Sequence, residues 1–160
     1  QMLRNLSLWQ MGTLAAGKPA DVALALLTLA ALLWLFMRDA NPLNALLLGE
    51  GEARHLGVNV QSLKRRLILL TAAGVGVAVA VSGMIGFVGL VVPHLVRLLA
   101  GPNHVRLLPL SALLGAALLL AADMLARTLL APAELPVGII TALLGAPFFI
   151  WLLVKGRRAL

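Results

Sequence analysis

Residues 46–66 read LLLGEGEARHLGVNVQSLKRR, and this stretch is the only long polar run in an otherwise strongly apolar sequence. It contains two of the six acidic residues and four of the thirteen basic ones: Glu50, Glu52, Arg54, Lys64, Arg65 and Arg66. The apolar segments on either side are too long for a small soluble core. A polar run held between membrane spans must lie in water, and its Lys/Arg content predicts the cytoplasmic side.

The overall composition restricts the chain to one class of protein. Of its 160 residues, 61% are hydrophobic and only 12% are charged, and the mean hydropathy is +1.01. A soluble domain carries about a quarter charged residues. The sequence therefore predicts an all-α fold, a polytopic transmembrane helical bundle of about five membrane-crossing helices, one of them short or broken, with short helices in the cytoplasmic run.

Several functions are disfavoured by the sequence. The net charge is +7, but the basic residues stand at the ends of apolar runs rather than in a stripe with interleaved aromatics, so we do not expect nucleic acid as a partner. Cysteine is absent, which excludes a disulfide framework and thiolate metal ligands. The sequence contains no G-x-x-x-x-G-K-[ST] motif for ATP binding. We predict no catalytic, cofactor-binding or metal site.

The polar run itself has two interpretations. At about 100° per residue, four of its residues fall on one narrow helical face: Leu46, Gly49, Ala53 and Leu56. Glu50 and Arg54 form an i, i+4 pair beside that face, and Gly57 suits a helix stop. The first interpretation is a solvated loop with a chance helix. The second is a docking helix whose small residues admit close approach by another protein.

The rest of the chain divides at its Gly, Pro and polar residues. Residues 1–20 are too broken to span a membrane and predict an interfacial helix with Trp9 at headgroup level. Asp21 is expected to cap the first span, and Asn41-Pro42 to break the helix after it. The expected spans cover residues 21–39, 67–83, 84–100, 107–128 and 137–154, and the cytoplasmic run covers residues 43–66. The span over 84–100 is short, so we expect other helices to cover it.

The distribution of basic residues supports five crossings. Ten lie on the side of the polar run: Arg38, Arg54, Lys64, Arg65, Arg66, Arg97, Arg106, Lys155, Arg157 and Arg158. The other side has three: Arg4, Lys18 and Arg127. The positive-inside rule favours this orientation. Five crossings place the N-terminus outside, and because the chain starts at Gln1 we expect a missing upstream portion.

Two pairs of residues within the spans are expected to be structural. His94 follows Pro93 near the cytoplasmic end of a short helix, and an intramembrane ionisable residue is a functional candidate by default. A packing or capping role is the preferred interpretation here. Asp123 and Arg127, at i and i+4, predict a structural ion pair near the outer membrane face. The spans offer no further acids for a proton relay, which disfavours ion-coupled secondary transport.

Three stretches together resemble the second half of the FecCD-type permeases, the membrane subunits of bacterial ABC importers for haem, iron–siderophores and vitamin B12. They are LLLGEGEARHLGV, SGMIGFVGLVVPHLVRLLAGPNHVRLLPLSALLGAALLLAADMLAR and ELPVGIITALLGAPFFIWLL. The similarity extends over nearly the whole chain from about Leu3. The resemblance implies a permease about twice this length with ten helices, of which residues 1–160 supply an outer gate helix and the last five spans.

The resemblance also implies an assembly and its contacts. Two permease copies form a central pathway in the inner membrane, two ATP-binding cassette ATPases bind underneath, and a periplasmic substrate-binding protein docks above. By the resemblance, the ATPase-coupling residues are Gly49, Glu50, Glu52, Ala53, Arg54, Leu56 and Gly57. The candidate gate and pathway residues are Leu3, Leu6, Trp9, Met11, Ser82, Gly83, Gly86 and Gly89.

The substrate ranking also follows from the resemblance. The opening LRNLSLWQMGTLA resembles haem permeases slightly more than cobalamin permeases, so we place haem first, ferric siderophore second and cobalamin third. Two other functions remain as alternatives: a structural or assembly subunit of a membrane complex, and an ion-coupled secondary transporter. Uptake that persists without this subunit would indicate the former, and dependence on a proton or sodium gradient the latter.

Overall fold

Four long apolar helices dominate the structure. The computed structural model describes residues 1–15, 17–129, 131–133 and 135–157. Helices α2 (Pro19–Arg38), α5 (Val60–Ser82), α7 (His104–Thr128) and α8 (Val137–Arg157) are each long and apolar enough to cross a membrane. A shorter apolar helix, α6 (Val88–Ala100), and three short helices, α1 (Met2–Gln10), α3 (Ala40–Leu46) and α4 (Glu50–His55), complete the described part. The all-α polytopic prediction is confirmed.

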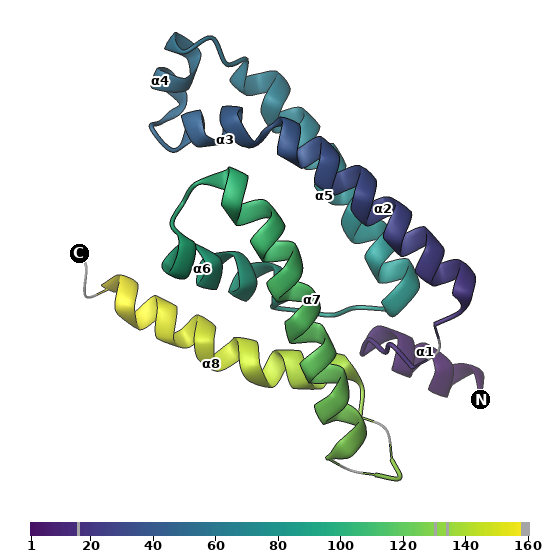
Figure 1. Cartoon of the computed structure of the whole chain (residues 1–160). Helices are drawn as coiled ribbons and strands as arrows, with labels where there is room; N and C mark the ends of the chain where they lie inside the picture. The colour runs from purple at the N-terminus through teal and green to yellow at the C-terminus, as the bar shows by residue number, and fades with distance from the viewer. Residues whose placement is uncertain (16, 130, 134, 158–160) are drawn as a thin grey trace.

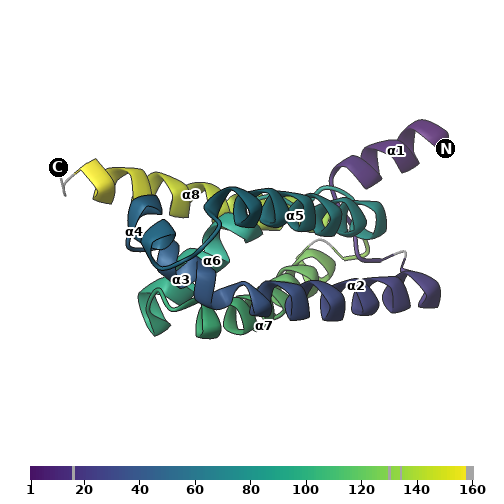
Figure 2. The same ribbon diagram turned by 90° about the horizontal axis from the view of Figure 1, so that it is seen from above.

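Helices α2 and α5 form an antiparallel pair (Figures 1 and 2). The expected cap of α2 is present, because the Asp21 carboxylate accepts a hydrogen bond from the Lys18 backbone N–H at 3.1 Å. Gly74 of α5 permits the close approach of the pair, since an added Cβ there would meet the side chain of Leu32. The apolar windows of both helices bury none of their residues. Their surfaces are therefore available to lipid or to further protein.

The chain between α2 and α5 departs from the sequence prediction in two places. The break after α2 falls at Asp39, and Asn41-Pro42 lie inside the first turn of α3. Proline is tolerated there because the first helical N–H groups have no intrahelical partner. Helix α5, which corresponds to the predicted span 67–83, begins at Val60 and not at Leu67. The Asn59 side chain caps it by accepting a hydrogen bond from the Ser62 backbone N–H at 3.1 Å.

Helix α6 is short, as predicted for residues 84–100. Its 13 residues rise about 20 Å, well under the roughly 30 Å of a bilayer core. An irregular segment, residues 83–87, precedes it and ends at Phe87, a non-glycine residue with φ of +68°. The Phe87 ring lies against Gly145 of α8, where an added Cβ would collide with it. Protein contact with α8 thus covers part of this irregular backbone.

Helices α6, α7 and α8 pack together and contain most of the buried residues of the described bundle. One cluster joins α7 to α8 through Ala122, Ala126, Val137 and Ile140. A second joins α6 to α7 through Val92, Val96 and Leu107. Each of the three helices contains an internal proline: Pro93, Pro109 and Pro147. The predicted spans 107–128 and 137–154 were each three residues too short, at the start of α7 and at the end of α8.

The two ends of the bundle differ in charge. Helices α3 and α4 and the C-terminal end of α8 lie at one end, and α1 lies at the other (Figures 1 and 2). We call the first of these the basic end, because it collects nine of the ten residues predicted for that side; the tenth, Arg158, lies outside the described residues. The positive-inside rule predicts that the basic end faces the cytoplasm.

Candidate functional site

The α3–α4 unit, residues 40–55, forms the polar projection at the basic end. Two glycines shape it: Gly49, with φ of +105°, precedes α4, and Gly57, with φ of +84°, follows it. Left-handed backbone of this kind is cheap only for glycine. The helical face drawn through Leu46, Gly49, Ala53 and Leu56 is therefore not continuous, because Gly49 separates α3 from α4. The predicted stop at Gly57 is confirmed.

The burial of Ala53 in α4 contradicts the prediction that this residue belongs to an exposed docking face. Ala53 is 0% exposed, and its carbonyl oxygen accepts from the Val58 N–H at 3.0 Å, so it belongs to the interior of the unit. It is unavailable to a partner in this conformation. The other predicted coupling residues are all exposed: Gly49, Glu50, Glu52, Arg54, Leu56 and Gly57. The small-residue face that sequence reasoning proposed is thus split between the interior and the surface.

Two exposed leucines, Leu47 and Leu48, are the part of this surface that sequence reasoning missed. Leu47 and Leu48, in the turn between α3 and α4, are exposed, as is Leu56 just after α4. They lie in sequence beside the charged Glu52 and Arg54. Apolar side chains within a charged surface are a common feature of protein–protein contact sites. The signal in the sequence was the triplet LLL that opens the polar run.

The Glu50 side chain makes a closer contact with α5 than with any charged side chain of its own helix, α4. Its carboxylate accepts from the Lys64 ammonium, whereas the expected partner within α4, Arg54, is 3.9 Å away. The hydrogen bond and the positive charge of Lys64 lower the pKa of Glu50 below its usual value, with a smaller contribution from Arg54. Both side chains of this pair are about half exposed, so it is a solvated contact.

Two further sets of polar contacts, which we call polar ties, connect the α3–α4 unit to the long helices. Asp39, between α2 and α3, is 4% exposed and accepts from Arg66 Nε at 2.8 Å and Nη2 at 2.5 Å. Asn44 of α3 accepts from the His104 backbone N–H at 2.7 Å, and its Oδ1 lies 2.9 Å from His104 Nδ1. Its amide also donates to Asn103 at 3.0 Å. Sequence reasoning found neither tie, because partners 27 and 60 residues apart leave no periodic signal.

Close backbone contacts join three segments at the opposite end of the bundle. The Thr13 N–H donates to the Ser82 carbonyl at 2.9 Å, and the Val137 N–H donates to the Gly12 carbonyl at 3.1 Å. A Cβ on Gly12 would collide with Met84, one on Gly83 with the Trp9 carbonyl, and one on Gly138 with the Met11 carbonyl. We call Gly12, Gly83 and Gly138 the glycine junction, since glycine is what permits this approach.

The predicted gate residues divide into two groups. Trp9, Met11, Ser82 and Gly83 come together at or beside the glycine junction. Leu3 and Leu6 are exposed along α1. The backbone around Gly86 and Gly89 is open, with no neighbouring atom within 4 Å of a Cβ placed on either. These four residues are therefore not brought into the junction in this structure.

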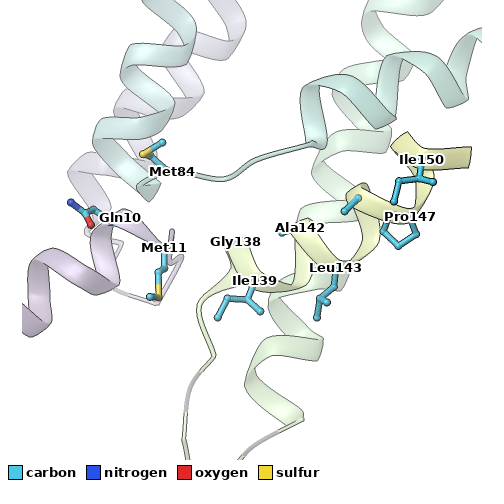
Figure 3. Close-up of a pocket in the computed structure, with 10 residues that line it drawn as sticks. Gln10, Met11, Met84, Gly138, Ile139, Ala142, Leu143, Pro147 and Ile150 are labelled. Carbon is cyan, nitrogen blue, oxygen red and sulfur yellow. The ribbon is translucent and has the colours of Figure 1, made fainter. Parts of the chain in front are cut away.

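An apolar cavity adjoins the glycine junction. It has a volume of about 570 Å³ and lies between the end of α1, Met84 and one side of α8 (Figure 3). Ten residues line it: Gln10, Met11, Met84, Gly138, Ile139, Ala142, Leu143, Ala146, Pro147 and Ile150. None of these ten is ionisable, and only Met11 was among the predicted pathway residues. A binding site here would rely on shape and apolar contact.

The residues predicted to be structural make intramolecular contacts. His94 packs edge-on against Phe148 of α8, with ring centroids 5.8 Å apart, next to Pro93 in α6. Arg127 Nε donates to the Asp123 carboxylate at 2.9 Å, which confirms the predicted ion pair near the end of α7. These contacts are consistent with packing roles for both pairs.

The fold defines a multi-pass helical membrane protein, and its 160 residues contain no G-x-x-x-x-G-K-[ST] motif. The chain belongs to the FecCD transport family, which matches residues 1–155. It is 53% identical over 158 residues to the hemin transport system permease protein HmuU of Yersinia pestis, covering 99% of this chain and 47% of that protein. It is 48% identical over 155 residues to the vitamin B12 import system permease protein BtuC of Vibrio cholerae, covering 97% and 46%.

A solved structure gives the same result for the fold. An inward-facing conformation of a metal-chelate type ABC transporter matches 97% of this chain and 50% of that chain, with a TM-score of 0.88 and 39% identity. The chain thus spans about half the length of the relatives it matches. These relatives are permease subunits of transporters and not enzymes, in agreement with the sequence prediction.

Proposed function

We propose that residues 1–160 form the C-terminal half of the membrane permease of an ABC importer in the bacterial inner membrane. The observation that carries the proposal is the α3–α4 unit. It presents exposed leucines beside charged side chains at the basic end, and polar ties fasten it to α5 and α7. ATP hydrolysis in a separate subunit docked on this unit supplies the energy for transport.

The proposed assembly contains three kinds of partner. Two ATP-binding cassette subunits dock at the basic end, and a second permease copy completes a central pathway as a homodimer. A periplasmic substrate-binding protein docks at the opposite end, near α1 and the glycine junction. The apolar windows of α2 and α5, in which no residue is buried within the described chain, are available to lipid and to the rest of the permease.

The proposed cargo is an iron chelate, with haem first and ferric siderophore second, and the cobalt chelate cobalamin is placed third. Support for haem is the greater identity to the hemin permease, 53% against 48% for the vitamin B12 permease. Both percentages fall in the same range, so cobalamin is tested directly beside haem and a ferric siderophore. The cavity without ionisable lining suits a large ligand that passes with little specific ligation, and selectivity then resides mainly in the substrate-binding protein.

Reconstitution of the complete importer tests the proposal. The full-length permease, its ATPase and its binding protein are assembled in proteoliposomes, and ATP-dependent uptake of hemin, a ferric siderophore and cobalamin is compared. We expect hemin to be taken up fastest. Uptake that persists when the permease is omitted would instead indicate an assembly subunit. Uptake that collapses with an imposed ion gradient and ignores ATP would indicate a secondary transporter.

A further inference from the structure

The most deeply buried charged side chain described in the chain lies at the corner between α2 and α3. Asp39 is 4% exposed and has one charged partner, Arg66 in the second turn of α5, which binds its carboxylate with two nitrogens at 2.8 and 2.5 Å. A two-pronged arginine–carboxylate contact fixes orientation as well as distance. The contact therefore orients the start of the α3–α4 unit relative to α5, through an Arg66 side chain that is about half exposed.

The opposite end of α5 reaches the glycine junction. Helix α5 has 23 residues and rises about 34 Å without an internal proline. At its last residue, the Ser82 carbonyl accepts from the Thr13 N–H at 2.9 Å, and Gly83 lies against the Trp9 carbonyl. An uninterrupted helix thus connects the Asp39–Arg66 pair to the contact with the residues that follow α1.

The contacts along the pair of spans favour movement as one body. Leu32 of α2 lies against Gly74 of α5, so the two helices are in close contact midway between their ends. Any displacement of α3 that preserves the Asp39–Arg66 contact must carry α5 with it. Coupling between distant sites is transmitted by packed, rigid elements of this kind.

We propose that Asp39 and Arg66 are positioning residues for energy coupling. The pair transfers displacement of the α3–α4 unit to α5, and α5 transfers it to the glycine junction. This inference rests on the proposed function, because it requires an ATPase that acts on the α3–α4 unit. The Asn44 contact with Asn103 and His104 provides a parallel connection to α7.

The test measures substrate taken up per ATP hydrolysed by the complete importer in proteoliposomes. Asp39→Asn keeps the shape of the side chain and removes its charge, and Arg66→Lys keeps the charge and removes the two-pronged geometry. We expect each variant to lower the ratio at least fivefold while the ATPase remains bound. The double variant Asp39→Arg/Arg66→Asp exchanges the two charges and can restore the ion pair. We expect it to take up more substrate per ATP hydrolysed than either single variant, Asp39→Arg or Arg66→Asp.

A matched control separates coupling from simple stability. Asp123→Asn also breaks an ion pair, but one within a single helix, where Arg127 Nε lies 2.9 Å from the Asp123 carboxylate. We expect its ratio of uptake to hydrolysis to equal that of the wild type. If Asp39→Asn merely reduces the amount of assembled importer and leaves the ratio unchanged, the pair is structural and the inference is wrong.

A cysteine reporter gives a second measurement that does not depend on uptake. The 160 residues contain no cysteine, so Thr13→Cys introduces the only thiol in this part of the permease. We expect its labelling by an impermeant maleimide to change with ATP, and the change to disappear with Asp39→Asn. Labelling that still responds to ATP in the variant would overturn the inference alone. A wild-type importer that neither binds the ATPase nor takes up substrate would overturn the proposed function as well.

Discussion

Gly138→Ala tests whether the glycine junction requires a residue without a side chain at position 138. Gly138 is helical, so the substitution carries no penalty for positive φ, and helix propensity alone predicts a gain of at most about 1 kcal/mol, because Gly138 lies in the first turn of α8. The added methyl group, however, collides with the Met11 carbonyl and approaches the Met84 carbonyl. Both obstacles are backbone atoms, so the collision can be relieved only by moving chain segments.

The size of the expected effect follows from three contributions. Overpacking costs about 1–3 kcal/mol, and we take the upper end because backbone must move. Loss of the Val137 N–H to Gly12 hydrogen bond adds about 1 kcal/mol. Subtracting the propensity gain of at most about 1 kcal/mol leaves a net destabilisation of about 3 kcal/mol.

Gly76→Ala is the matched control for this measurement. Gly76 is also helical, in α5, but a Cβ there meets no atom within 4 Å. Thermal unfolding of the full-length permease in detergent is expected to rank Gly76→Ala at or above wild type and Gly138→Ala clearly below it. A Gly138→Ala variant that is as stable as Gly76→Ala would refute the steric account of the junction.

Three further predictions concern the α3–α4 unit. Leu56→Ser is expected to weaken binding of the ATPase to the full-length permease about tenfold without altering the melting midpoint, because burial of an exposed leucine side chain contributes about 1.5–3 kcal/mol and about 1.4 kcal/mol is tenfold in affinity. Unchanged binding would remove Leu56 from the docking surface. Ala53→Leu is expected to lower stability by about 1–3 kcal/mol, since the side chain is fully buried, and a wild-type melting midpoint would contradict that burial. The Glu50–Lys64 contact lowers the pKa of Glu50, so its stabilising effect is fully present above the unfolded-state pKa and is lost as the pH falls through the folded-state pKa. The stability difference between wild type and Glu50→Gln should accordingly vanish in strongly acidic solution, whereas a difference that grows on acidification would exclude the contact.

The parts of the fold that depend on local sequence were predictable. Long apolar runs specify α2, α5, α7 and α8, and Pro93 with the glycines before it indicated that α6 would be short. Gly57 ends α4 and Asp21 caps α2 because their effects act within a few residues. The Asp123–Arg127 pair was found for the same reason, as its partners are one helical turn apart.

The parts that depend on tertiary contact were not predictable. The inward direction of Ala53 follows from the backbone turn at Gly49, whose positive φ no periodic pattern encodes. Helix α5 extends seven residues before its apolar run, because Asn59 caps it and the basic cluster remains helical in water. Gly138 lies in an apolar helix where a small residue suggests only close packing, and its role appears once Met11 lies against it.

The internal prolines of α6, α7 and α8 make these three helices easier to bend than α2 and α5. Each removes one backbone hydrogen bond and leaves a carbonyl four residues earlier without its usual partner, which makes a helix easier to bend at that point. The interiors of α2 and α5 contain no proline, so these two helices resist bending. In the proposed transport cycle, curvature is therefore expected to change in the three proline-containing helices, of which α8 lines the cavity, and to change less in α2 and α5.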